Sequence, residues 1–135
     1  MFEVSAKVDY GLLILLELAK TGTNDYQALA DIAAKHNVSP KFLSQVIIPL
    51  KQHGLVTSRE GKRGGYKLAR PLAVITLRAL VEAMDGPLQL VRCMTDTKLC
   101  PAEQACSTKP VWQKLKLDIY QLLDRTTLHD LYVRD

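Results

Sequence analysis

The residues best suited to chemistry in this 135-residue chain are three cysteines that lie close together. Cys93, Cys100 and Cys106 follow the pattern C-x6-C-x5-C. Thiolates are soft ligands that suit an iron–sulfur cluster or zinc, and three of them leave room for a fourth ligand. The spacing differs from the short C-x-x-C pairs of zinc ribbons. An odd trio argues against a disulfide framework, so redox-active thiols and inert packing residues are the alternatives to a metal centre.

A second chemical feature is a concentration of basic charge. From residue 41 to residue 70 seven Lys and Arg side chains face one acid, Glu60, a balance of +6 against +4 for the whole chain. The seven are Lys41, Lys51, Arg59, Lys62, Arg63, Lys67 and Arg70. Clustered cations are typical of a surface that binds nucleic-acid phosphates, because phosphate contacts release condensed counterions. The alternative is a solvated face on a protein-interaction domain.

The segment that must present these charges, residues 29–68, is predicted to begin as a helix-turn-helix. Leu29 and Ile32 start an apolar face at helical spacing. After a turn, Ser39 can accept from the backbone amides of a second helix, and Pro40 suits its first position. This second helix would then be the element that carries reading side chains.

A short hairpin completes the module. Residues 55–58 and 66–68 alternate as strands around a glycine-rich tip at residues 60–65. Pro49 is expected to kink the second helix, which would leave its first two turns as the reading surface. The predicted fold class is mainly α with a small β-wing, a winged helix-turn-helix followed by a long C-terminal dimerisation helix.

Two further helices are expected to pack around this module. The first covers residues 4–19 and opens at Ser5; its core stripe is predicted to be Val8, Leu12, Leu15, Leu16 and Ala19. The second begins after Thr76 as its cap and stops at residues 85–87. The three histidines, His36, His53 and His129, are expected at the surface.

The end of the chain is predicted to be a dimerisation arm. Pro110 begins a long helix that runs to about Arg125, and residues 128–133 add a last turn. An apolar stripe on this helix would stay partly uncovered in a monomer: Val111, Leu115, Ile119, Leu122 and Leu123. A two-fold partner would cover it and set two reading helices ~34 Å apart on a pseudo-palindromic DNA site. Residues 1–70 would form the DNA-binding domain, and residues 71–135 the linker helix, cysteine loop and dimerisation helix.

Composition excludes several other classes. Hydrophobic residues make up 47% and charged residues 24%, as in a folded soluble chain. The longest apolar run, residues 11–16, is too short to span a bilayer, and no signal-peptide pattern opens the chain, so we expect a cytoplasmic protein without membrane contact. No nucleotide-binding glycine motif, nucleophile elbow or paired carboxylates stand out, so we expect no enzymatic activity.

Taken together, these parts resemble a family of bacterial winged-helix regulators that includes the cluster regulator IscR, the nitric-oxide sensor NsrR and the cysteine-metabolism regulator CymR. The matching parts are the Asp9-Tyr10 opening, LADIAAKHNVSPKFLSQVIIPLKQHGLV, GGYKLARP, ITLRALVEAMDGPLQL, the cysteine loop and VWQKLKLDIYQLLDRTTLHDL. Each is weak alone, whereas their order and spacing over nearly the full length are specific.

The resemblance implies that the second helix enters the major groove and the wing the minor groove. By position, it places Ser39, Lys41, Phe42, Ser44, Gln45, Arg63, Gly64 and Gly65 at the DNA, and we add the basic Arg59 and Lys62. Gln45 suits adenine, to which an amide can bind twice. Ser44 stands where IscR has a discriminating glutamate, and Glu60 where many members are basic, so operator preferences do not carry over. Arg63 is the expected wing insert.

The resemblance also implies a [2Fe–2S] or [4Fe–4S] cluster on Cys93, Cys100 and Cys106. Lys109 stands where IscR-like proteins place a histidine ligand, whereas Asp9 stands where NsrR-like proteins supply an aspartate. Asp9 is therefore the expected fourth ligand, an oxygen donor. One extra residue separates the first two cysteines relative to the family.

The resulting hypothesis is a homodimeric, sequence-specific regulator of double-stranded DNA, a repressor gated by an iron–sulfur cluster or by cysteine redox state. The alternative is a metal-free regulator that acts by binding a small metabolite or a metabolic enzyme. Steep salt dependence of binding to a palindromic DNA fragment would separate DNA recognition from an enzyme-binding role.

Overall fold

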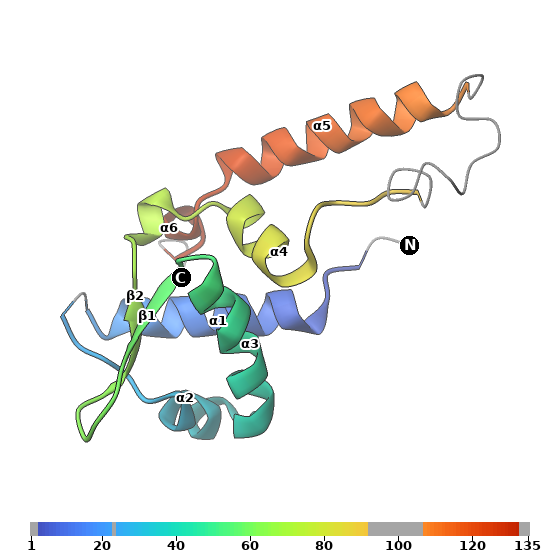
Figure 1. The fold of residues 1–135 in the computed structure, drawn as a ribbon. Coiled ribbons are helices and arrows are strands. Elements are labelled where there is room, and N and C mark those ends of the chain that lie inside the picture. Colours follow the sequence, from blue (N-terminus) through green and yellow to red (C-terminus); the bar gives the residue numbers. More distant parts are fainter. Residues whose placement is uncertain (1–2, 23, 92–106, 133–135) are drawn as a thin grey trace.

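The computed structural model describes residues 3–22, 24–91 and 107–132, so the three cysteines lie outside the described residues. The elements are α1 (Ala6–Lys20), α2 (Leu29–His36), α3 (Pro40–Gln52), β1 (Val56–Arg59), β2 (Gly65–Leu68), the 3-10 helix η1 (Leu72–Val74), α4 (Leu77–Asp85), α5 (Lys109–Arg125) and α6 (Leu128–Tyr132). In Figure 1, helices α1 to α4 and the hairpin form one body, and α5 lies along its upper side. The predicted fold class is confirmed: the protein is mainly helical with a two-stranded antiparallel wing.

Local capping chemistry places the helix starts where the sequence predicts them. The Ser5 and Ser39 hydroxyls accept from the amides of Val8 and Phe42, each at 3.3 Å. The Thr76 hydroxyl likewise accepts from Ala79, at 3.1 Å. Helix α3 continues through Pro49 to Gln52, so that proline does not end the helix.

The turn between α2 and α3 depends on a left-handed residue. Asn37 closes α2 with φ 55°, a conformation that asparagine tolerates better than most residues. Its amide bonds back to the last turn of α2, and the amide of Val38 donates to Ala33 at 2.9 Å. This tight connection fixes the angle at which α3 leaves the helical pair.

The core differs from the predicted stripe on α1. Val8 and Leu15 are buried as expected, but Ile14 and Leu18 are also buried, whereas Leu12, Leu16 and Ala19 are half-buried and pack at its edge. The reason is that α1 contacts α3, α4 and β2, so a single stripe cannot describe its buried surface. Other buried core residues include Ile32, Leu43, Val46, Leu50, Leu55, Ile75, Leu80 and Leu128.

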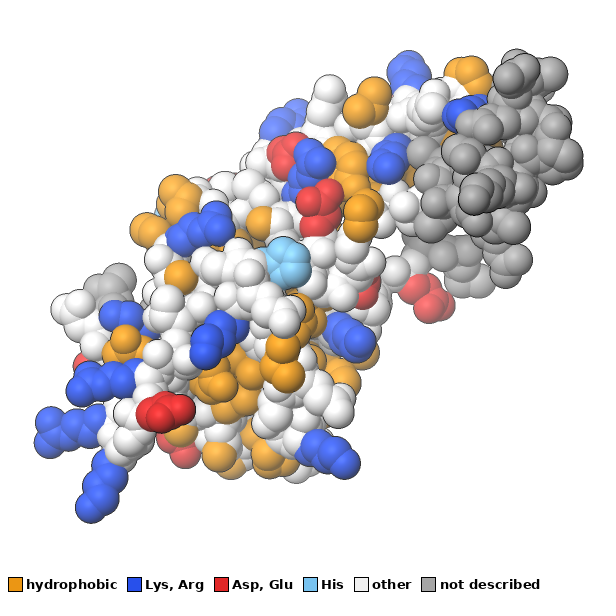
Figure 2. Space-filling model, in the orientation of Figure 1, with side chains coloured by type: hydrophobic (Ala, Val, Ile, Leu, Met, Phe, Trp, Pro, Cys, Tyr) orange, Lys and Arg blue, Asp and Glu red, His pale blue; other side chains and the backbone are white. Residues whose placement is uncertain are grey.

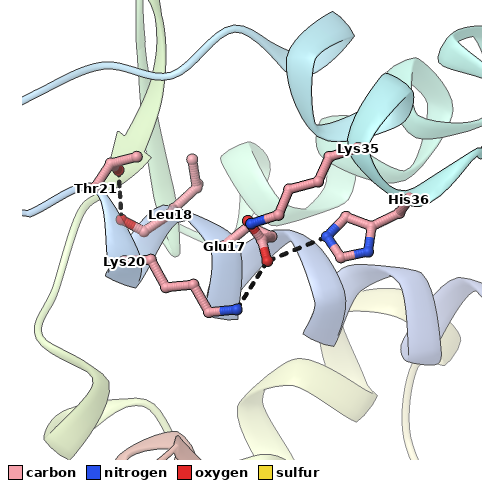
Figure 3. A network of polar contacts seen from close by, with 6 residues as sticks. All are labelled: Glu17, Leu18, Lys20, Thr21, Lys35 and His36. Atoms are coloured by element: carbon pink, nitrogen blue, oxygen red, sulfur yellow. Dashed lines mark hydrogen bonds and ion pairs between the residues drawn. The ribbon is translucent and has the colours of Figure 1, made fainter.

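A buried carboxylate ties α1 to α2. Glu17 is 3% exposed; its carboxylate lies 2.9 Å from Nζ of Lys35, 3.0 Å from Nζ of Lys20 and 3.1 Å from Nε2 of His36 (Figure 3). Burial raises its pKa, but hydrogen bonds from Lys35, Lys20 and His36 outweigh this and lower the pKa to about 2. His36 therefore departs from the expected surface position, whereas His53 and His129 are exposed.

Helix α5 is held to the body at one end and along one side. The amide of Leu77 donates to Thr126 at 2.8 Å, and that of Leu128 to Ile75 at 2.9 Å, joining the junction of α5 and α6 to the segment before α4. Within the described part of α5, Tyr120 alone is buried, with the guanidinium of Arg78 3.9 Å from its ring centre. The long final helix was predicted correctly, and most of its surface faces outward.

Candidate nucleic-acid interface

Helix α3 divides cleanly into a buried and an exposed side. Leu43, Val46, Ile47 and Leu50 are buried against the other helices. The side chains of Ser39, Lys41, Ser44 and Gln45 are exposed, as the sequence predicted for reading residues. The Ser44 hydroxyl donates to the carbonyl of Pro40 at 2.8 Å, within its own helix. The polar half of α3 is therefore open to a partner.

Phe42 has a different environment from the other predicted reading residues. It is half-buried, and its ring meets Tyr10 of α1 edge to face, with centroids 5.1 Å apart. The structure thus gives Phe42 a role in fixing the start of α3 against α1. Tyr10 follows Asp9 in the sequence, so this contact joins the N-terminal part of α1 to the first turn of α3.

The hairpin geometry explains its two adjacent glycines. Strands β1 and β2 pair in antiparallel register, with Val56 opposite Leu68 and Arg59 opposite Gly65. A Cβ on Gly64 would overlap the carbonyl of Arg59, and one on Gly65 would overlap the backbone of Gln27. Gly65 also has φ +140°, which other residues rarely adopt. Both glycines are therefore required by backbone packing.

The hairpin is fastened to the segment before α2. The backbones of Gln27 and Tyr66 exchange two hydrogen bonds, of 2.8 and 2.9 Å. The ring of Tyr26 receives two cations of the hairpin, Nζ of Lys67 4.9 Å and Cζ of Arg59 5.7 Å from its centroid. Sequence reasoning missed Tyr26 and Gln27, because a single bridge between distant segments leaves no periodic signal.

Basic side chains gather around the hairpin tip. Arg59, Lys62 and Arg63 are exposed, and Figure 2 shows a group of blue side chains extending from this end of the molecule. Together with Tyr26 and Asp31, they line a cleft of about 660 Å³ between the hairpin and the start of α2. In Figure 1 the hairpin tip and the start of α3 both lie on the side away from α5.

Of the expected metal ligands, only Asp9 lies among the described residues. Cys93, Cys100 and Cys106, with the rest of residues 92–106, lie outside the described residues. Asp9 is exposed in the first turn of α1, one turn after Ser5, whose hydroxyl donates to Asp85 of α4 at 2.8 Å. In the described ranges, no three His, Cys, Asp or Glu residues converge on a possible metal position.

None of the helices described in the structure combines the length and hydrophobicity that a bilayer-crossing segment requires.

Comparison with known proteins agrees with this architecture. Residues 4–134 match the Rrf2 family, described as an iron-dependent transcriptional regulator. The transcriptional regulator CymR of Bacillus subtilis is 34% identical over 129 residues, covering 96% of this chain and 88% of the relative.

Two solved structures, of CymR and of IscR, have the same fold. The structure of B. subtilis CymR, the global cysteine regulator, has a TM-score of 0.78 at 33% identity and covers 100% of this chain and 99% of that one. The structure of IscR from T. potens has a TM-score of 0.73 at 32% identity, covering 96% and 85%. The family and its named relatives are transcriptional regulators and not enzymes, in agreement with the sequence prediction. The chain belongs to the Rrf2 family of transcriptional regulators.

Proposed function

We propose that the chain is a homodimeric, sequence-specific DNA-binding repressor, gated by an iron–sulfur cluster or by the redox state of its cysteines. One observation carries the proposal: the start of α3, whose polar side chains are exposed, and the hairpin tip with its exposed cations lie on the same side of the body, away from α5 (Figure 1). A DNA duplex is the partner that uses a helix face and a positive hairpin together, because one fits a groove while the other reaches across the backbone.

The exposed side chains divide into two roles. Lys41, Ser44 and Gln45 would meet base edges in the major groove, and the Gln45 amide can bind both N6 and N7 of adenine. Arg59, Lys62 and Arg63 would contact phosphates or the minor groove, with Arg63 inserted. Gly64 and Gly65 serve the same surface indirectly, because they let the hairpin close against Arg59 and Gln27.

The residues present fit an iron–sulfur cluster by donor chemistry. Cys93, Cys100 and Cys106 would supply three thiolates, and Asp9, which is exposed in the first turn of α1, would supply an oxygen. Such a cluster supplies reversible redox and ligand-exchange chemistry when bound. Asp9 sits beside Tyr10, whose ring packs on Phe42 at the start of α3. Movement of the first turn of α1 would therefore displace the start of α3. The state of the cluster would then change DNA affinity by changing the population of the DNA-binding conformation.

A second candidate is a metal-free regulator that responds to a small metabolite or a metabolic enzyme. Similarity to CymR favours it, and so does a pocket of about 600 Å³ at the base of the hairpin. The pocket is lined mainly by apolar groups between the end of α1, the end of β2 and α6, with Arg70 and His129 among its polar members. A pocket of this size suits a small molecule.

Anaerobic purification tests the cluster. Visible absorbance with matching iron and sulfide is expected for the cluster-bound protein, and replacement of Cys93 or Cys106 by Ala should abolish it. A colourless, metal-free protein that still binds DNA would instead favour the second candidate. If the cysteine variants bind DNA like the wild type under both oxidising and reducing conditions, the loop has no switching role.

DNA recognition is tested separately by salt titration. The wild-type protein should select specific sequences from a random duplex library, and log K should fall linearly with log salt concentration. Binding that is weak, unselective and insensitive to salt would contradict DNA recognition. An enzyme partner captured through the hairpin without any DNA binding would point to the alternative role.

A further inference from the structure

The reading face of α3 continues past the residues that the sequence singles out. An α-helix turns about 100° per residue, so Ser44 and Gln45 lie about 60° and 40° to either side of Lys41. Ile48 follows Lys41 by seven residues and lies about 20° from it, between Ser44 and Lys41 around the helix axis. By the same measure buried Leu50 lies on the opposite side. Ile48 is therefore central to the exposed face.

Ile48 is also chemically distinct from its neighbours on that face. Its side chain is 53% exposed, although isoleucine is a residue that is usually buried. Lys41, Ser44 and Gln45 around it are polar and exposed. Single exposed aliphatic side chains are common at protein surfaces, so exposure alone identifies no partner for Ile48. What sets Ile48 apart is its place among Lys41, Ser44 and Gln45 on one exposed helix face.

We propose that Ile48 is a specificity-determining residue that reads the 5-methyl group of thymine in the major groove. This inference rests on the proposed DNA-binding function. The thymine methyl is the one apolar feature that a base pair presents in that groove, and aliphatic side chains recognise it by contact. The positions 41, 44, 45 and 48 also follow the i, i+3, i+4, i+7 spacing with which a homeodomain helix reads bases.

The roles on α3 are then complementary. Polar Ser44 and Gln45 bind donors and acceptors of base edges, whereas Ile48, one turn further along, excludes water from a methyl group. Its stiff β-branched side chain has little rotamer freedom in a helix, so it presents a defined apolar surface at small entropic cost. In a symmetric pair, one thymine in each half-site would be read in this way.

The test uses the full-length protein and a random-sequence duplex library. Wild type selects a best-bound duplex, and each thymine of that duplex is then replaced in turn by deoxyuridine, which lacks only the methyl group. At one thymine per half-site we expect about a fourfold loss of wild-type affinity for each methyl removed. Ile48→Ala should bind the thymine duplex more weakly and lose that sensitivity, whereas Ile48→Val should retain part of it.

Val74 provides the matched control. It lies in η1, outside α3, and is 57% exposed, close to the exposure of Ile48. Val74→Ala should keep the wild-type response to deoxyuridine. Equal losses for wild type and Ile48→Ala at every thymine would overturn the assignment of Ile48 while leaving DNA recognition intact. A wild type that selects no sequence would overturn the proposed function and this assignment with it.

Discussion

Helices α3 and α5 are both amphipathic, yet they present opposite kinds of surface. In α3 four apolar residues are buried, and the exposed side is mostly polar. In the described α5 only Tyr120 is buried, and Val111, Leu117 and Leu122 are exposed, the last at 56%. A polar helix face set beside cations suits nucleic acid, whereas an uncovered apolar stripe suits another protein surface. Under the proposed function, α3 would therefore meet DNA and α5 a second copy of the chain.

The largest expected effect comes from introducing negative charges into the apolar stripe of α5, at Val111 and Leu122. Val111 and Leu122 lie about 20° apart around the helix, so together they mark one face. Val111→Glu/Leu122→Glu should raise the dissociation constant of the proposed homodimer about a hundredfold or more, because two carboxylates would be buried without partners. Sedimentation equilibrium measures this change, and operator affinity should fall with it.

Leu117 supplies a sharp control for that experiment. It is 62% exposed on the same helix, but it lies about 120° from Val111, away from the proposed stripe. Leu117→Glu should leave the dimer intact. If Leu117→Glu dissociates the dimer and the double variant does not, the contact face has been assigned to the wrong side of α5.

The second-largest expected effect concerns the stability that Glu17 provides by joining α1 to α2. Glu17 has a folded-state pKa of about 2 against an ordinary value of 4.5, so its charged form stabilises the fold. The difference corresponds to about 3 kcal/mol, fully present above pH 4.5 and lost as the pH falls towards 2. Urea unfolding should show stability falling through this window. Glu17→Gln should lower stability at pH 7 by a similar amount and flatten the dependence.

Glu82→Gln is the matched control for Glu17. Glu82 also forms an ion pair, 3.2 Å from Arg78, but both side chains are about one third exposed. Solvent screens such pairs, so this variant should change the unfolding free energy far less than Glu17→Gln. Equal changes in unfolding free energy for the two variants would show that the buried ion pairs of Glu17 stabilise the fold no more than an exposed pair does.

Residues that act through their own neighbours were predictable from the sequence. Ser39, Pro40 and Thr76 mark helix starts because capping uses amides within a few positions. Glu17 was missed because its partners Lys35 and His36 lie on another helix, and in the sequence it looks like the polar end of an apolar run. Tyr26 was missed for the same reason, since its cations come from the hairpin.

The outward direction of Ile48 could be predicted from the sequence, but its exposure could not. Helical spacing turned it outward, but the sequence offers no way to distinguish an uncovered isoleucine from one covered by a neighbouring helix. The exposure of Ile48 in the folded chain makes that distinction. The exposed side of α3 was therefore predicted in outline, whereas which of its side chains are left uncovered by other helices depends on the tertiary structure.

The third effect separates the cations of the two regions. Arg63 is exposed at the hairpin tip, and Lys114 is exposed on α5. Arg63→Ala should weaken binding to the selected duplex about tenfold and reduce the salt slope by about one, because one phosphate contact or minor-groove insertion is lost. Lys114→Ala should change neither quantity in a fluorescence-anisotropy titration. Equal losses for both variants would mean that charge acts over the whole molecule and not through the wing.

The smallest effect tests how α5 is joined to the rest. The Tyr120 hydroxyl accepts from the amide of Leu88 at 2.8 Å, fixing the chain that leaves α4 against the middle of α5. Tyr120→Phe keeps the ring under Arg78 and removes only this bond, so stability should fall by about 1 kcal/mol with the dimer unchanged. Tyr132→Phe, at a more exposed ring, should have no effect. Leu88 lies a few residues before Cys93 in the sequence. If the cysteines act on DNA binding through α5, Tyr120→Phe should therefore also alter the change in DNA affinity that follows cysteine oxidation. If Tyr120→Phe leaves that change in DNA affinity as in the wild type, the cysteines would instead act on α3 through Asp9 and the Tyr10–Phe42 contact.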